Sequence, residues 1–241
     1  MNINNLDPNN KIVQCWANKP SEYEDMLSFQ KWFDAASSLE QVVNQSKNDW
    51  NNRIANFDLF SNLKKNTCLE IGFGGGRLIY QASKVFKYSF GIDIHSNFSK
   101  TEEFLSSYKT RNYKLLHRNN ANSLPKNCFD FIFSFIVFQH FHNLEEVDFY
   151  LDIIKSRLNK DGVAHIFFGK SKTKNHKVES DDRFKERNCS LWLDPELFRD
   201  RVSNMGFEII EYQNLMPKKN SKPIGPKNIS GQARVLFKLK Q

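Results

Sequence analysis

The chain has 241 residues, 39% of them hydrophobic, and its 35 Lys and Arg against 27 Asp and Glu give a formal net charge of +8. That length allows one sizeable core, as one domain or as one domain with an appendage, and the charge favours anionic partners of any chemical kind. Four scattered cysteines without a C-x-x-C pair argue against a disulfide framework and against a cysteine-held metal.

The N-terminal twenty residues are rich in asparagine and lack the basic-then-apolar order of a secretory signal. The longest apolar run, FDFIFSFIVF at 129–138, is shorter than the ~18 residues that a membrane span requires, and it contains Asp130. The sequence therefore predicts a cytoplasmic protein without a membrane span.

From Ser21 to Lys65 the apolar residues recur at helical spacing among polar ones, which predicts amphipathic helices. From Thr67 the pattern changes to short apolar runs that alternate with helical segments. We therefore divide the chain into a helical N-terminal extension or lid, 1–65, and an α/β domain, 66–241.

Short apolar runs predict seven strands, at 67–71, 88–93, 113–117, 129–138, 163–168, 207–212 and 233–240. Predicted helices include one near 98–108, one over 144–158 that Asn143 and Glu146 cap as a pair, and one that Asp194-Pro195 starts and Gly206 ends. Because strands alternate with helices, we expect a mostly parallel sheet with helices on both faces. The run at 129–138 is apolar on both faces and is expected at the centre of the sheet.

A glycine-rich turn, LEIGFGGGR, joins the first predicted strand to a helix. Glycines in such a turn let backbone N–H groups approach a ligand closely, so the turn predicts a nucleotide-like cofactor. Gly72, Gly74 and Gly76 are spaced G-x-G-x-G, and Arg77 stands where the dinucleotide fingerprint G-x-G-x-x-G has its third glycine.

Glu70 precedes these glycines, and the resulting E-x-G-x-G-x-G resembles motif I of the class I S-adenosylmethionine-dependent methyltransferases. Later segments resemble further motifs of that family: FGIDIH, RNNANSLPKNCFDFIFS, FSFIVFQHF, LNKDGVAHIFF and LWLDPELFRDRVSNMGFEIIEY. The resemblance runs from about Thr67 to Lys240. It implies the Rossmann-like class I fold for 66–241 and S-adenosyl-L-methionine as the cofactor.

The same resemblance implies the residues of the cofactor site, which are Glu70, Gly72, Gly74, Gly76, Asp93, Asn120 and Ala121. Phe135 is added because ligands of open parallel sheets bind beyond the C-terminal strand ends, which places it near the transferred methyl group. Asp93 stands where the family has an acid for the ribose hydroxyls. Asn120 replaces the usual adenine-binding Asp, and its carbonyl oxygen can still accept from an exocyclic amine. Arg53 is a candidate for the methionine carboxylate, as arginines before motif I are in some relatives, and an exposed helix arginine is the alternative.

His140 follows the fourth predicted strand and is the best candidate for a catalytic base, with a structural role as the alternative. His142 is a weaker candidate. Trp16, Tyr23, Trp32 and Trp50 are candidates for a lid over the substrate or for ordinary core packing. No metal site is expected.

The fourth predicted strand is not followed by D/N-P-P-Y/F, and no Pro-Cys occurs, which argues against acceptors such as adenine amino groups and pyrimidine C5. Two basic loops, 169–188 and 216–228, are expected to border the acceptor and to attract a phosphate or carboxylate through Lys170, Lys172, Lys174, Lys218, Lys219 and Lys222. The expected function is methylation of a small anionic acceptor, with O-methylation of a sugar, glycan precursor or secondary metabolite favoured. RNA methylation and a non-catalytic cofactor-binding partner are the alternatives, and the oligomeric state is left open.

Overall fold

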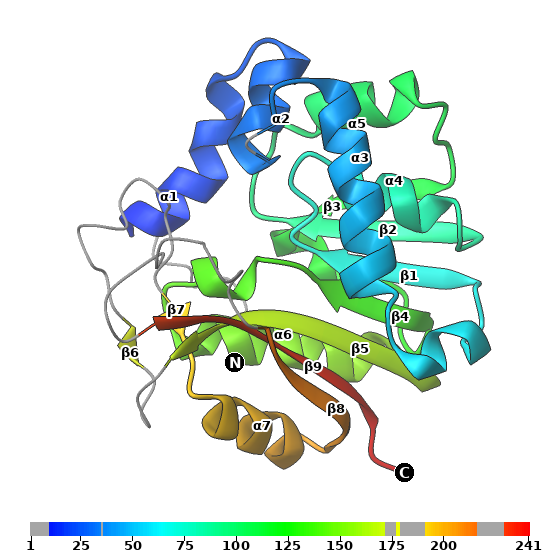
Figure 1. Ribbon diagram of the computed structural model, residues 1–241, viewed down its shortest axis with the longest axis vertical. Helices are drawn as coiled ribbons and strands as arrows, with labels where there is room; N and C mark the ends of the chain where they lie inside the picture. Colours follow the sequence, from blue (N-terminus) through cyan, green and yellow to red (C-terminus); the bar gives the residue numbers. More distant parts are fainter. Residues whose placement is uncertain (1–9, 35, 172–176, 179–190, 216–228) are drawn as a thin grey trace.

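The structure is a computed structural model that describes residues 10–34, 36–171, 177–178, 191–215 and 229–241. Its centre is one twisted sheet with the strand order β3-β2-β1-β4-β5-β9-β8 (Figure 1). The strands are β1 Thr67–Ile71, β2 Tyr88–Asp93, β3 Tyr113–His117, β4 Phe129–Ser134, β5 Leu158–Ser171, β8 Phe207–Leu215 and β9 Ile229–Leu239. The first five pair in parallel and β9 is antiparallel to both neighbours, so the predicted mostly parallel seven-stranded sheet is confirmed.

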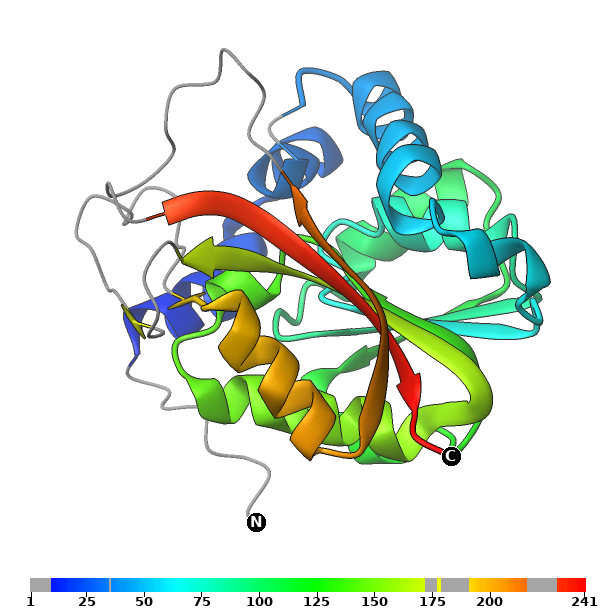
Figure 2. The same ribbon diagram turned by 60° about the horizontal axis from the view of Figure 1, so that its bottom comes forward.

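Helices cover both faces of this sheet, as predicted (Figure 2). Three of them, α3 Leu39–Asp49, α4 Arg77–Ser83 and α5 Phe98–Ser107, lie on one face, while α6 Leu144–Arg157 and α7 Pro195–Asn204 lie on the other. The N-terminal part adds α1 Lys11–Asn18 and α2 Met26–Asp34, and short helical turns lie at η1 Lys19–Glu22, η2 Trp50–Ile54, η3 Asp58–Asn62, η4 Arg118–Ser123 and η5 Phe138–His140. A small second sheet pairs β6 Lys177–Val178 with β7 Leu191–Trp192, which the sequence did not predict.

β4 is the central strand that its two apolar faces predicted, because all of its residues are buried. The prediction that it continues to residue 138 is wrong. Ile136 has a φ of 61°, a left-handed conformation that breaks the strand, and the chain then coils into η5. The segment after β4 therefore leaves the sheet after Ser134.

β5 begins at Leu158, earlier than the predicted 163–168, so Asp161 and Gly162, which the sequence places in a turn before the strand, lie inside it. The strand passes this point through a bulge, where the pairing with β4 shifts between Phe129 and Phe131. Gly162 is needed there, because a Cβ would fall 2.6 Å from the Phe129 carbonyl oxygen.

The predicted N-caps of α6 and α7 are present, but only half of the predicted Asn143–Glu146 pair is formed. The Asn143 side chain accepts a hydrogen bond from the Glu146 N–H at 3.0 Å, and Asp194 caps α7 with Pro195 in its first turn. Glu146 does not close the reciprocal pair on Asn143, because its carboxylate accepts from the His142 N–H at 2.9 Å instead. The carboxylate is therefore directed back toward the segment that follows β4.

The end of the N-terminal extension packs into the main core. Trp50, Ile54 and Phe57 belong to the same buried cluster as the β4 side chains Phe131 and Phe133. Arg234 of β9 donates from Nη1 to the carbonyl oxygens of residues 53 and 56, at 3.0 and 3.1 Å. A boundary at residue 65 stays a prediction, and these contacts place η2 firmly against the sheet.

His165 of β5 makes a further link to this region and gives a pH prediction. Its Nδ1 donates to the Ile54 carbonyl oxygen at 2.9 Å, and burial lowers its pKa to about 3. In the unfolded chain this histidine takes up a proton as the pH falls through ~6.5, whereas in the folded protein it does not. The unfolding free energy therefore decreases as the pH falls below ~6.5. Between pH 7 and 5, wild type should lose about 2 kcal/mol more unfolding free energy than His165→Asn. Urea unfolding at both pH values measures this, and equal losses would contradict the assignment.

Candidate functional site

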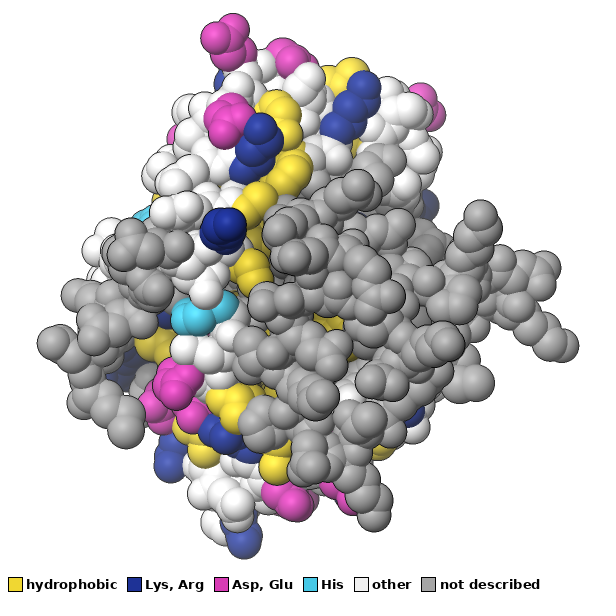
Figure 3. All heavy atoms as spheres, turned by 90° about the vertical axis from the view of Figure 1, so that its left-hand side faces the viewer, with side chains coloured by type: hydrophobic (Ala, Val, Ile, Leu, Met, Phe, Trp, Pro, Cys, Tyr) yellow, Lys and Arg dark blue, Asp and Glu magenta, His cyan; other side chains and the backbone are white. Residues whose placement is uncertain are grey.

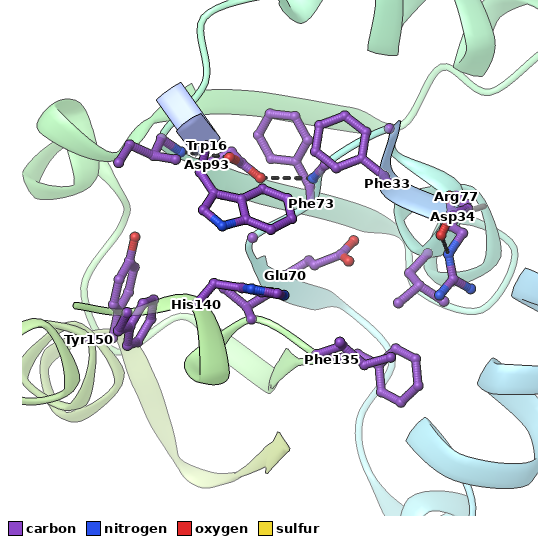
Figure 4. Close-up of a pocket in the computed structure, with 18 of the residues that line it drawn as sticks. Trp16, Phe33, Asp34, Glu70, Phe73, Arg77, Asp93, Phe135, His140 and Tyr150 are labelled. Carbon is purple, nitrogen blue, oxygen red and sulfur yellow. Dashed lines mark hydrogen bonds and ion pairs between the residues drawn. The ribbon is translucent and has the colours of Figure 1, made fainter. Parts of the chain in front are cut away.

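A pocket lies beyond the C-terminal ends of β1, β2 and β4, where the strand order reverses (Figure 4). Ligands of open parallel sheets bind at this edge. The pocket spans about 970 Å³, including the part that is open to solvent. Its walls come from α1 and α2, the glycine turn, the ends of β2 and β4, and α6: Ile12, Val13, Trp16, Phe33, Asp34, Glu70, Gly72, Phe73, Gly74, Gly75, Arg77, Leu78, Asp93, Ile94, Phe135, Ile136, Val137, His140, Phe141, Glu146 and Tyr150.

The glycine turn is held so tightly that its first two glycines tolerate no side chain. Gly72 and Gly74 have φ values of 77° and 48°, in the left-handed region that favours glycine. A Cβ on Gly72 would lie 2.4 Å from Val137 Cγ2, and one on Gly74 would lie 2.8 Å from Phe33 Cδ1. The turn is therefore packed between the segment after β4 and α2.

The Gly74 residue is fixed on both sides by hydrogen bonds. Its N–H donates to Asp93 Oδ2 at 2.8 Å, and its carbonyl oxygen accepts from Thr101 Oγ1 at 3.0 Å and from His95 Nε2 at 3.1 Å. Asp93 Oδ1 accepts two more backbone N–H groups, from Ile94 at 2.7 Å and from His95 at 3.2 Å. Since a carboxylate offers about four acceptor positions, Oδ2 retains capacity for about one further donor, such as a ribose hydroxyl.

Glu70 at the end of β1 directs its carboxylate into the pocket (Figure 4) and is only 2% exposed. Burial raises its pKa well above the usual range, against the opposing effect of Arg77, and Asp93 and Asp34 raise it further. Among the described residues, its Oε2 has no hydrogen-bond partner. An orphaned carboxylate oxygen in a cavity suits a positively charged ligand group, which S-adenosyl-L-methionine carries twice, as a sulfonium and an ammonium.

Arg77 ties the N-terminal helices to the start of α4. It forms ion pairs with Asp34 of α2 and, from Nη1 at 2.9 Å, with Asp49 of α3. Burial raises the pKa of Asp34 to about 6, with Arg77 opposing the shift. Arg53 also pairs with Asp49, at 3.6 Å, and does not line the pocket; its guanidinium stands 5.7 Å from the Phe135 ring centre.

Trp16 of α1 and His140 of η5 meet on one side of the pocket, with their ring centres 4.3 Å apart. Phe33 lies 6.3 Å from Trp16, so aromatic rings surround this region together with Phe135. Of the four tryptophan and tyrosine candidates for a lid, Trp16 lines the pocket, whereas Trp50 belongs to the core.

Most of the predicted site residues converge on this pocket, namely Glu70, Gly72, Gly74, Asp93, Phe135 and His140. Others do not line it: Gly76 is the residue before α4 and faces Thr101, Asn120 is exposed on η4, Ala121 is buried, and His142 bonds Glu146. Lys170 lies at the end of β5, while Lys172, Lys174, Lys218, Lys219 and Lys222 fall outside the described residues.

Sequence reasoning did not find Asp34, Phe33, Glu146 and Tyr150 as lining residues, and it noted Arg77 only for its spacing. Their side chains reach the pocket from helices distant in the sequence, which spacing alone does not reveal.

Across the described part of the chain, no group of His, Cys, Asp and Glu is arranged to hold a metal ion. No helix there is long and apolar enough to cross a membrane.

Residues 69–166 match the model of a family described as a methyltransferase domain. No curated protein matches the sequence. The fold is similar to that of an S-adenosylmethionine-dependent methyltransferase from Clostridium acetobutylicum, with 12% identity, a TM-score of 0.57, and coverage of 89% of this chain and 97% of that one. It is also similar to the DhpI–SAH complex, with 10% identity, a TM-score of 0.59, and coverage of 95% and 97%.

A third similar structure is the phosphoethanolamine N-methyltransferase 2 of Haemonchus contortus, in complex with phosphomonomethylethanolamine and S-adenosylhomocysteine. Its identity with this chain is 16% and the TM-score is 0.63, with coverage of 91% of this chain and 61% of that one. Likeness at these identities establishes the fold, and the class I fold predicted from the sequence is confirmed.

The packing of the glycine turn gives a prediction that compares two glycines. Gly74→Ala and Gly206→Ala both place a side chain at positive φ, 48° and 91°, which costs about 1–2 kcal/mol. Only the Gly74 Cβ would also collide with Phe33, since the nearest atom to a Cβ on Gly206 is Lys155 Nζ at 3.6 Å. Urea unfolding should therefore show Gly74→Ala to be less stable than Gly206→Ala by roughly 1–3 kcal/mol. Equal losses would mean that α2 does not press on the turn.

Proposed function

We propose that the chain is a class I S-adenosylmethionine-dependent methyltransferase and that it methylates a small molecule held beside Trp16 and His140. One observation carries this proposal: a single pocket joins the glycine turn, Glu70 and Asp93 to an aromatic region that contains a histidine. The N-terminal helices α1 and α2 form part of its wall, which favours a compact acceptor over a polymer.

The pocket residues fit the cofactor by charge and by hydrogen-bonding capacity. Glu70 suits the positively charged methionine end, and the remaining capacity of Asp93 Oδ2 suits one ribose hydroxyl. The cofactor, when bound, supplies a methyl group that its sulfonium already activates, so the chain needs no covalent intermediate. The chain's task is to orient the acceptor, which can contribute ~7–11 kcal/mol.

The acceptor is proposed to present an uncharged reacting atom. Arg77 is the one Lys or Arg among the described lining residues, and two aspartates already pair with it. The lining carboxylates Asp93 and Glu146 would repel an anionic group placed beside them. The anionic character expected of the acceptor thus depends on loops 169–188 and 216–228, most of which lies outside the described residues.

For a hydroxyl acceptor, His140 is the proposed general base. A hydroxyl must lose its proton as it is methylated, and His140 lies beside the aromatic region in which we place the acceptor. O-methylation of a sugar, glycan precursor or secondary metabolite is the favoured subclass. The phosphomonomethylethanolamine held by the Haemonchus contortus enzyme supports a small acceptor in this fold.

RNA methylation is less well supported than a small-molecule reaction. On the face that carries α1, the described Lys and Arg side chains are interspersed with acidic side chains and a hydrophobic strip (Figure 3). A continuous basic surface is the usual electrostatic mark of nucleic-acid binding. The net charge of +8 favours RNA in general terms, and a steep fall of RNA affinity with salt would support that alternative.

The proposed reaction can be tested with a cofactor whose methyl group carries deuterium. Wild type, incubated with this cofactor and a fractionated metabolite extract, should produce labelled small molecules that mass spectrometry identifies. His140→Ala should lower the rate by about 10²–10⁴-fold if His140 is the base, with cofactor affinity retained. Full activity of the variant would rule out His140 as the base. Cofactor binding by wild type without any labelled product would instead support the non-catalytic alternative.

Asp93→Ala tests the proposed cofactor contact. Loss of a charged hydrogen-bond acceptor should weaken the binding of S-adenosylhomocysteine by about 1.5–3 kcal/mol, measured by calorimetry. Asp200→Ala, in the exposed middle of α7, is the matched control for the loss of one carboxylate. Unchanged affinity in Asp93→Ala would refute the contact.

A further inference from the structure

The far end of the pocket is not built from the residues that the sequence motif assigns to adenine. Asn120 and Ala121 lie on η4 outside the lining, Asn120 exposed and Ala121 1% exposed. If Asp93 contacts the ribose, the base extends to the side away from the methionine arm and therefore away from Glu70.

That end is formed by the residue after β2 and by the start of α6. Ile94 follows Asp93, and Phe141, Glu146 and Tyr150 come from the segment after η5 and from α6. The Phe141 and Tyr150 rings stack, with centres 5.0 Å apart and planes 8° apart. In Figure 4, Tyr150 stands on the Asp93 side of the pocket, opposite to Arg77 and Asp34. Apolar and aromatic surfaces of this kind suit a purine.

Glu146 is the charged side chain at this end, and it is held in place. Its Oε2 accepts from the His142 N–H at 2.9 Å and lies 2.8 Å from His142 Nδ1. Its Oε1 lies 3.9 Å from Arg118 Nη1, which is beyond hydrogen-bond length. The residue is 7% exposed and lines the pocket, so Oε1 keeps acceptor capacity on a nearly buried carboxylate.

We propose that Glu146 accepts a hydrogen bond from the exocyclic amine of the cofactor's adenine, the role that the motif assigns to Asn120. This inference rests on the proposed function, because it concerns the same cofactor pocket. His142 and Arg118 act as positioning residues that fix the carboxylate. Asn120 then makes no contact with adenine, because the residue that binds the adenine amino group lies on α6 rather than on η4.

A carboxylate at this place discriminates between purines. It accepts from a 6-amino group, whereas a 6-oxo group presents an acceptor to an acceptor and leaves the buried carboxylate unpaired. Wild type should therefore bind S-adenosylhomocysteine more tightly than S-inosylhomocysteine by at least about tenfold. Binding, rather than turnover, is the measurement, so the acceptor need not be known.

The main experiment is calorimetry with these two ligands on wild type, Glu146→Gln and Asn120→Ala. Glu146→Gln is isosteric, and its amide can donate to a 6-oxo group, so the preference should fall by about tenfold or more. Asn120→Ala should keep the wild-type preference. The inference is overturned if Glu146→Gln keeps the preference or if Asn120→Ala removes it.

A second ligand tests the inference on wild type alone, in case Glu146→Gln folds poorly. A methyl group on the exocyclic amine would crowd the closed end beside Glu146 and Tyr150, so N6-methyl-S-adenosylhomocysteine should bind at least about tenfold more weakly than the parent. If the amine faced Asn120, the methyl group would point toward solvent and be tolerated, which would overturn the inference. Failure of wild type to bind S-adenosylhomocysteine at all would instead overturn the proposed function.

Discussion

The close packing of the turn between β1 and α4 is the constraint on which the rest of the site depends. Val137 and Phe33 approach Gly72 and Gly74 so closely that no Cβ fits between them. The segment after β4 and helix α2 are thereby placed against the same few backbone atoms. Because both supply pocket walls, the shape of the pocket follows from the absence of two side chains.

The N-terminal helices are part of the pocket rather than an addition to a finished domain. The Gln30 side-chain amide donates to the Gly75 carbonyl oxygen at 2.7 Å, and Asp34 pairs with Arg77 beside the same turn. Burial holds the pKa of Asp34 near 6, so its carboxylate is mostly ionised at neutral pH and compensates the buried guanidinium. We propose that α1 and α2 complete the binding site, and that the term lid describes α1 best.

The sequence predicted the sheet well because its strands are short apolar runs with clear turns between them. It predicted β1, β2 and β3 to the residue. It extended β4 too far, because the left-handed backbone of Ile136 has no signature in an apolar run. Motif positions located Glu70 and Asp93 in the pocket, but Arg77, Asp34 and Glu146 depend on contacts between distant helices, which no local pattern encodes.

The contact between Trp16 and His140 makes the fluorescence of Trp16 sensitive to changes in the acceptor region. An indole whose ring centre lies 4.3 Å from an imidazole changes its emission when that neighbour is displaced or protonated. A molecule that inserts between the two rings has to separate them. In a variant whose other tryptophans, Trp32, Trp50 and Trp192, are replaced, the fluorescence of Trp16 can thus report occupancy of the acceptor region before the natural acceptor is identified.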